Sequence, residues 1–204
     1  MNIESVIIET ADTVAAERFY PAAFDLGDRL RVRSSDAPSS GFRGFTISLV
    51  VSQPGNVNAI VDSALSAGAT TLKPVSKSLW GVGGTVQAPD GTIWKVATSA
   101  KKDTEPVTRA FDQLVVLLGV EDVAASKRFY AERGLQVGKS FGSYADFAMP
   151  SSPVKLGLYR RRALAKDAGV PEDGAGSHRI ALVGDGAGFA DPDGFTWEAR
   201  VHQP

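Results

Sequence analysis

Residues 15–20 read Ala-Ala-Glu-Arg-Phe-Tyr, and residues 124–130 repeat them as Ala-Ala-Ser-Lys-Arg-Phe-Tyr. A second pair of stretches follows in the same order, Pro-Asp-Gly-Thr-Ile-Trp over 89–94 and Pro-Asp-Gly-Phe-Thr-Trp over 192–197. The two pairs recur at spacings of about 110 and about 103 residues by the numbering, so the chain is a tandem duplication of one unit. The copies differ directly after the tryptophan, where the first has Lys95 and the second has Glu198.

The composition is that of an ordinary globular protein and excludes several functional classes. The 204 residues suffice for two domains, and 43% are hydrophobic while 22% are charged. The net charge of −1 provides no basic field, which argues against nucleic acid as the main partner. The absence of cysteine excludes disulfides and cysteine-based zinc sites. No secretory signal or membrane span is recognisable, so we expect a cytoplasmic protein without membrane contact.

The hydrophobic pattern predicts an α+β fold in both copies. Each copy starts with a β-branched strand, 3–10 or 113–118, and a helix that follows Asp12 or Asp122 as N-cap. The first helix is expected to present Val14 and Phe19 on one face. In the first copy we expect further strands at 28–33, 44–52, 70–74, 83–87 and 92–98 and a helix at 57–67. In the second copy we expect strands at 135–140, 143–148, 154–159 and 179–183 and a helix at 162–168.

The predicted domain boundary lies in a charged stretch without apolar periodicity. Residues 100–110 are therefore expected to link a first domain, 1–99, to a second domain, 111–204. Strands are missing after residue 33, and the seven residues 184–190 are too few for the helix that occupies 57–67 in the first copy. The two halves thus lack different parts of one ancestral unit, and the second has a shortened second module.

This order of motifs resembles the vicinal oxygen chelate superfamily, which includes glyoxalase I, extradiol dioxygenases and bleomycin-resistance proteins. The resemblance rests on the two Phe-Tyr helices, on Ala67-Gly68-Ala69-Thr70, on Trp80-Gly81 and on the two Pro-Asp-Gly turns. It implies two tandem glyoxalase-like domains of paired βαβββ modules, with some elements lost in each half. Curved mixed sheets then enclose a cleft for a small-molecule ligand or substrate. Related proteins often dimerise, so a homodimer is one expected assembly.

The resemblance also implies positions for a divalent metal, which the two halves fill differently. In the first half Lys95 stands where a ligand is expected, and an ammonium repels a metal ion, so no metal is expected there. In the second half the matching residues are Gln113, His178 and Glu198. Imidazole, amide and carboxylate suit Zn, Ni, Mn or Fe(II). His178 and Glu198 also have plain structural interpretations, since His178 follows a glycine-rich loop and Glu198 fits a surface strand, and Gln113 alone is uninformative.

Three hypotheses for the function follow. The first is a metal-dependent lyase or dioxygenase that uses Gln113, His178 and Glu198; no further catalytic residue is assigned, and whether the protein is an enzyme stays open. The second is metal-free sequestration of an antibiotic-like molecule, as in bleomycin resistance, by a cleft whose walls are Trp80, Phe42, Phe45 and Tyr144. The third is a structural remnant with both clefts filled. Trp94, Trp197 and the two Phe-Tyr pairs are expected in the core.

Overall fold

Helix α1 (Thr13–Ala23) contains the first repeated motif and begins, as predicted, after Asp12. The Asp12 carboxylate accepts a hydrogen bond from the Ala15 N–H at 2.9 Å, which satisfies one free donor of the first turn. Asp122 caps the second copy, helix α3 (Val123–Glu132), by accepting from Ala124 and Ala125. One detail of the expected helix face is wrong: Val14 is exposed, while Phe19 and Tyr20 are buried.

The computed structural model describes residues 1–200, so the last four residues of the predicted second domain lie outside the described part. The strands form one mixed sheet of 13 strands and a separate two-stranded sheet, β3 with β12. The elements in chain order are β1 (Ile3–Thr10), α1 (Thr13–Ala23), the short 3-10 helix η1 (Gly27–Arg29), β2 (Leu30–Ser34), β3 (Ser39–Gly41), β4 (Phe45–Val50), α2 (Pro54–Ser66), β5 (Thr70–Ser78), β6 (Gly81–Gln87), β7 (Ile93–Thr98), β8 (Gln113–Val120), α3 (Val123–Glu132), β9 (Gln136–Phe141), β10 (Tyr144–Ala148), β11 (Val154–Arg160), α4 (Arg161–Ala168), β12 (Gly174–Gly176), β13 (Ile180–Gly184), β14 (Phe189–Ala190) and β15 (Thr196–Ala199).

These elements form four modules, of which two are complete. Module 2 runs from β4 through α2 to β7, with the strand order β4-β7-β6-β5. Module 3 runs from β8 through α3 to β11, with the equivalent order β8-β11-β10-β9. Module 1 retains β1, α1 and β2, and module 4 retains β13, β14 and β15. The predicted α+β fold of paired βαβββ modules, with different losses in each half, is confirmed.

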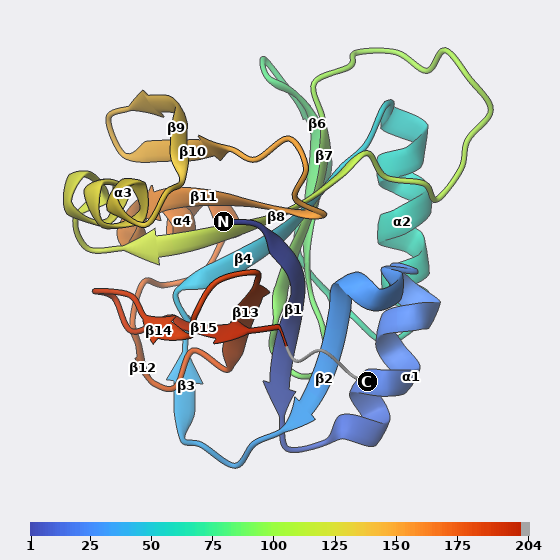
Figure 1. Cartoon of the computed structure of the whole chain (residues 1–204). Helices are drawn as coiled ribbons and strands as arrows, with labels where there is room; N and C mark the ends of the chain where they lie inside the picture. Colours follow the sequence, from blue (N-terminus) through green and yellow to red (C-terminus); the bar gives the residue numbers. More distant parts are fainter. Residues whose placement is uncertain (201–204) are drawn as a thin grey trace.

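The modules pair across the sequence repeat. The first strands of modules 2 and 3, β4 and β8, are antiparallel neighbours and form the centre of an eight-stranded half-sheet. The first strands of modules 1 and 4, β1 and β13, are likewise antiparallel and form a smaller half-sheet of β2, β1, β13, β15 and β14. Figure 1 shows the smaller group below the larger one. Each half-sheet, and the cleft on its concave face, therefore contains strands of both repeats. The domain boundary at 100–110 stays a prediction.

The repeated motifs hold each repeat together through buried tyrosines. In the first repeat the Tyr20 hydroxyl donates to Asp90 at 2.5 Å. In the second, the Tyr130 hydroxyl donates to Asp191 at 2.6 Å and accepts from Trp197 Nε1 at 3.1 Å. Trp94 and Trp197 are buried, as the sequence predicts. In each repeat the tyrosine of the Phe-Tyr helix thus bonds an aspartate at the Pro-Asp-Gly turn: Asp90 within the turn in the first repeat and Asp191, directly before Pro192, in the second.

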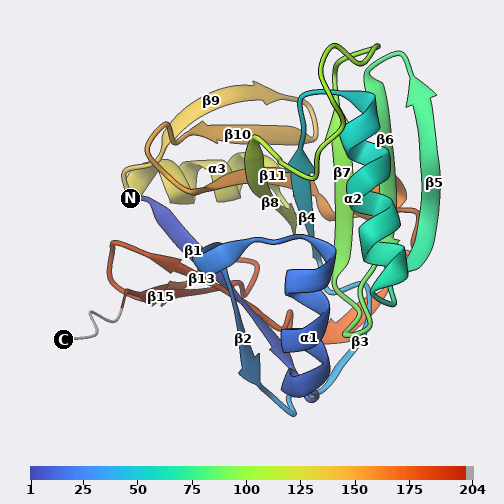
Figure 2. The same cartoon turned by 90° about the vertical axis from the view of Figure 1, so that its right-hand side faces the viewer.

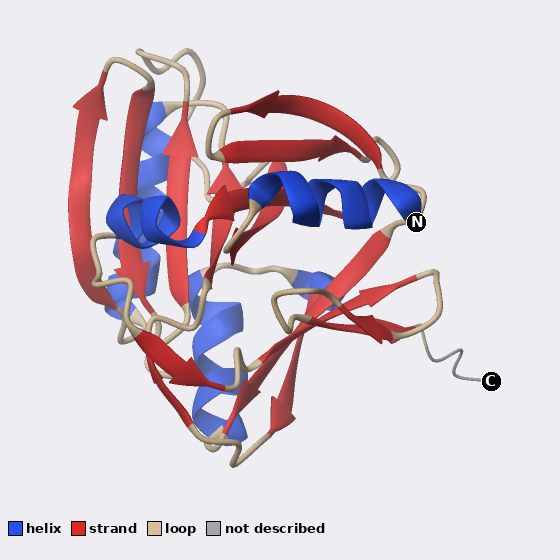
Figure 3. Ribbon diagram, turned by 90° about the vertical axis from the view of Figure 1, so that its left-hand side faces the viewer, coloured by secondary structure: helices blue, strands red, loops and turns tan. Residues whose placement is uncertain are grey.

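Helices cover both faces of the eight-stranded half-sheet. Helices α1 and α2 lie next to each other on one side, as Figure 2 shows, where α2 packs on β6 and β7. The short helix α4 crosses the opposite, concave face and contacts β4, β8 and β11 (Figure 3). Leu164 and Ala165 of α4 are buried there against Phe42 and Ile93. No helix of the described residues is long and apolar enough to span a bilayer.

Candidate functional site

Three charged side chains meet on the concave face of the smaller half-sheet. Side chains alternate along a strand, and Ile8 and Trp197 point into the core. Their neighbours Glu9 on β1 and Glu198 on β15 therefore point to the opposite face. Arg33 stands beside Glu9 in the parallel register of β2 with β1. Strands β1 and β2 of module 1 and strand β15 of module 4 thus bring an arginine and two glutamates together.

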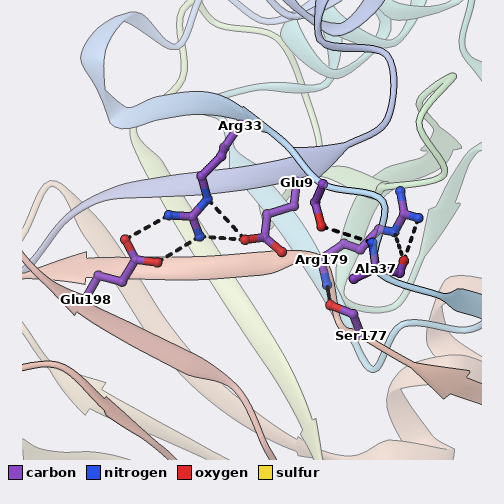
Figure 4. Close-up of polar contacts among 7 residues, drawn as sticks. Glu9, Arg33, Ala37, Ser177, Arg179 and Glu198 are labelled. Atoms are coloured by element: carbon purple, nitrogen blue, oxygen red, sulfur yellow. Dashed lines mark hydrogen bonds and ion pairs between the residues drawn. The ribbon is translucent and has the colours of Figure 1, made fainter.

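The Arg33 guanidinium lies between the two carboxylates, as Figure 4 shows. It donates through Nη1 and Nη2 to the two oxygens of Glu198, at 3.0 and 2.8 Å. It donates through Nε and Nη2 to Glu9 Oε1, at 3.1 and 2.5 Å. Hydrogen bonding to Glu198, more than that to Glu9, raises the pKa of Arg33 against the opposing effect of burial. The two carboxylates are thus already neutralised in part by a permanent cation.

The backbone beside this cluster is held by Arg179, which has a positive φ of 53°. Its guanidinium donates to the Ala37 carbonyl at 3.1 and 2.7 Å, and its N–H donates to Ser177 Oγ at 3.0 Å. The Glu9 N–H in turn donates to the Arg179 carbonyl at 3.0 Å (Figure 4). These bonds fix the start of β13 against β1, so Glu9 is presented from a rigid part of the sheet.

The concave face of the larger half-sheet also has a cation at its centre. Lys95, on β7, forms an ion pair with Asp167 of α4 at 2.6 Å. Lys73, on β5, donates to the carbonyls of Lys166 and Asp167 at 2.8 and 2.6 Å. The last turn of α4 is thus held by two lysines. Ser48, directly beside Lys95 in the register of β4 with β7, has a buried hydroxyl with no hydrogen-bond partner among residues 1–200.

A cavity of about 310 Å³ lies on the half of this face that belongs to module 2. Its floor includes Gly83, Thr85 and Ala97, its inner end is the Lys95–Asp167 pair, and Trp80 lines its outer part. Trp80 is 88% exposed. The predicted ligand-binding residue Trp80 therefore lines a real cavity, although most of its indole faces solvent.

On the module 3 half, aromatic side chains occupy the same face. Tyr144 packs against Phe141 and Tyr159, with ring centroids 5.3 Å apart in both pairs, and its hydroxyl donates to Asp146 at 3.0 Å. Burial and the Asp146 carboxylate raise the pKa of Tyr144. The other predicted ligand-binding residues, Phe42 and Phe45, line a different cavity of about 310 Å³ below α4. The structure therefore distributes the four predicted residues over three places and does not gather them into one site.

His178 lies in a structural contact with two backbone carbonyls. Its Nδ1 faces the Arg43 carbonyl at 2.5 Å and its Nε2 faces the Asp193 carbonyl at 3.0 Å, and the ring stacks on Phe195. In the first repeat Arg43 occupies the same place, two residues before the strand, and donates to the carbonyl of Asp90. Both residues thus hold the aspartate carbonyl of a Pro-Asp-Gly turn. Because each imidazole nitrogen faces an acceptor, neither presents a lone pair to a metal ion.

The three predicted metal ligands lie in different parts of the fold. His178 is next to Gly44, whose carbonyl bonds Gly119 near the end of β8. Gln113 stands at the other end of β8, about 20 Å away at 3.3 Å per residue. Glu198 belongs to the other half-sheet and is bound by Arg33. No group of three or more His, Cys, Asp and Glu side chains among residues 1–200 is arranged for a metal. These residues do not fit the metal that the resemblance implies.

Arg33, Lys73 and Asp167 lie in the two clefts, although no sequence pattern points to them as site residues. The local sequence places Arg33 only at the end of an expected strand, 28–33. Its partner Glu198 is 165 residues away, and nothing local indicates that pairing. The one available signal was Lys95 after Trp94, because a lysine at that place calls for a carboxylate on a facing element.

Two solved structures have this fold over nearly the whole chain. Glyoxalase I from Zea mays is 14% identical, with a TM-score of 0.65, over 97% of this chain and 91% of that one. A putative dioxygenase from Bacillus subtilis is 10% identical, with a TM-score of 0.62, over 98% of this chain and 84% of that one. No family model matches the sequence, and no curated protein matches it either.

Proposed function

We propose that this protein, which has the glyoxalase-like fold of the vicinal oxygen chelate superfamily, binds a small, partly aromatic molecule without a metal ion. The ligand lies in the Trp80 cavity, on the module 2 half of the large cleft. The observation that carries the proposal is the pair of side-chain cations, Arg33 and Lys95, at the centres of the two clefts. Each is already bound by carboxylates.

Electrostatics oppose a metal ion beside either cation. A divalent ion next to Lys95 is repelled by the ammonium group, and the nearest carboxylate, Asp167, is already paired with that ammonium. In the smaller cleft, Arg33 uses hydrogen bonds to both Glu198 oxygens. A metal ion would have to displace a bidentate guanidinium contact, which is among the stronger ion pairs in proteins.

The position of Trp80 supports an aromatic ligand. Its backbone is held at the turn between β5 and β6, where the Trp80 N–H donates to Ser78 Oγ at 3.2 Å and Lys101 donates to the carbonyls of Ser78 and Leu79. An exposed tryptophan on a fixed turn loses little conformational freedom when a ring stacks on it. Since α4 fills the middle of the concave face, the ligand is confined to the module 2 half.

The test combines a fluorescence screen with calorimetry on protein purified without an affinity tag. Trp94 and Trp197 are buried, so ligand-induced changes in emission report mainly on Trp80. Aromatic compounds that change the emission saturably are then titrated by calorimetry into Trp80→Ala and into Leu79→Ala. Leu79 is a matched control, because it is 91% exposed on the same turn but does not line the cavity. Loss of binding only in Trp80→Ala supports the proposal; equal binding by both variants, or no binding compound, refutes it.

A further inference from the structure

Two lysines of the Trp80 cavity converge on one residue of the chain itself, Asp167: Lys95 on its carboxylate and Lys73 on its backbone carbonyl. Lys73 and Lys95 come from different strands, and both bond the last turn of α4, at 2.6 Å to the Asp167 carbonyl and 2.6 Å to its carboxylate. Lys95 is paired with a carboxylate, whereas Lys73 has only backbone carbonyls as partners, so the two ammonium groups together form a binding position for an anion. Asp167 fills that position in the free protein.

The cavity has a surplus of positive charge. Among residues 1–200, the charged residues that line it are Lys73, Lys95 and Asp167, two positive and one negative, which gives a net charge of +1. The other polar lining groups include the hydroxyls of Thr85 and Thr98. A ligand with one negative charge can therefore take over the role of Asp167 beside the two lysines, whereas a neutral ligand that displaced Asp167 would leave both ammonium groups without a counter-charge.

The internal ion pair is open to competition from solvent. The side chains of Lys95 and Asp167 are 31% and 38% exposed, and exposed pairs of this kind contribute only about 0.2–1 kcal/mol. Exchanging the Asp167 carboxylate for a ligand carboxylate keeps the number of charges around Lys95 constant. The exchange thus costs little, and the ligand gains the contact with Trp80 in addition.

A hydroxyl without a partner lies next to this position. Ser48 is 8% exposed, and its Oγ has no hydrogen-bond partner in the described part of the chain. It stands directly beside Lys95 in the strand register, so the two side chains share the concave face. An unmet buried hydroxyl is unfavourable, and a carboxylate drawn to Lys95 would bring it an acceptor.

From these contacts we infer that the ligand is a small aromatic carboxylate and that Asp167 is its internal competitor. The carboxylate lies at Lys95 and Lys73 in place of Asp167, and the ring lies toward Trp80. This inference rests on the proposed function and adds the chemical class of the ligand. It also assigns α4 a role, since its last turn covers the anion position until a ligand carboxylate replaces Asp167.

The test compares benzoate with its neutral analogue benzamide by calorimetry. A charge-assisted hydrogen bond contributes about 1.5–3 kcal/mol, so wild-type protein should bind benzoate at least about 10-fold more tightly than benzamide. Asp167→Asn should tighten benzoate binding by about 3-fold, because 0.2–1 kcal/mol of competition is removed, and leave benzamide unchanged. Lys95→Met should abolish the preference for benzoate, and Lys95→Arg should retain it. Lys77→Met is the matched control, as Lys77 is on β5 but does not line the cavity.

Circular dichroism and thermal unfolding establish that each variant is folded before binding is compared. Equal affinity for benzoate and benzamide in the wild type overturns the inference but leaves the proposed function standing. Weaker benzoate binding by Asp167→Asn overturns the competitor role of Asp167. If neither compound binds and no aromatic compound changes the Trp80 emission, the proposed function fails as well.

Discussion

Replacing Arg33 by methionine tests directly whether an internal cation organises the smaller cleft. The variant keeps an unbranched side chain of similar length but leaves Glu9 and Glu198 facing the same space without a partner. The side chains of Arg33, Glu9 and Glu198 are 41, 18 and 33% exposed. The cluster is thus neither fully exposed nor fully buried, and its contribution to stability should lie between those two cases.

The expected loss follows from these exposures. Exposed ion pairs contribute about 0.2–1 kcal/mol, and breaking a fully buried pair costs about 3–5 kcal/mol. For this partly exposed arginine with two carboxylate partners, we expect Arg33→Met to lower the free energy of unfolding by about 1–2 kcal/mol. At about 2–4 °C per kcal/mol for a chain of this size, the melting temperature should fall by about 2–8 °C.

The assay is urea unfolding followed by circular dichroism, with Arg31→Met as the matched control. Arg31 lies on the same strand and is exposed, and it has no ion pair among the described residues. Its replacement should change the free energy of unfolding by less than about 0.5 kcal/mol. Adding Glu9→Gln and Glu198→Gln to Arg33→Met should restore part of the loss, because it removes the remaining repulsion. Equal stability of the two arginine variants would refute the reasoning.

Three further predictions concern the core and the turns. Burial raises the pKa of Tyr130 above its ordinary value of 10.0, so at high pH the native state keeps a proton that the unfolded chain loses. The stability from this proton is complete below about pH 10 and should fall above it by up to about 1.4 kcal/mol per pH unit. Urea unfolding at several pH values should show that the free energy of unfolding of Tyr130→Phe falls less steeply with pH than that of the wild type. Gly81→Ala should unfold or destabilise the protein severely, because its Cβ would lie 1.8 Å from the Thr98 carbonyl at a φ of +136°; Gly142→Ala, with nothing within 4 Å, should cost only about 1 kcal/mol in the same assay. His178→Ala should lower the melting temperature by an amount equivalent to about 1–3 kcal/mol, since a backbone carbonyl loses its donor and Phe195 loses the stacked ring, and an unchanged melting temperature would contradict the structural role of His178.

The sequence predicted most of the longer elements, because each is determined by neighbouring residues; the short strands β3, β12, β14 and β15 were not predicted. Asp12 and Asp122 cap their helices as expected, and Gly169 ends α4 with a φ of 83°. The burial of Trp94 and Trp197 also followed from pattern alone. Local periodicity, N-cap chemistry and glycine conformation need no knowledge of the distant chain.

The pairing of modules was not predicted, because a duplicated sequence contains no local record of which copies are neighbours. Strand β4 pairs with β8 and β1 with β13, and this choice decides which side chains share a cleft. The Arg33 contact to Glu198 depends on the pairing of modules 1 and 4. The Lys95 contact to Asp167 depends on the path of α4 across the larger half-sheet. The two-carbonyl contact of His178 is equally non-local, since Arg43 is 135 residues away.

Metal content is the measurement that tests the central claim most directly. Protein purified without an affinity tag is analysed for Zn, Ni, Mn and Fe, and its melting temperature is then recorded with each ion added. We predict far less than one metal ion per chain and no stabilisation by any of them, because Arg33 and Lys95 already supply the cations of the two clefts. A near-stoichiometric metal that is retained through purification and raises the melting temperature would contradict the account.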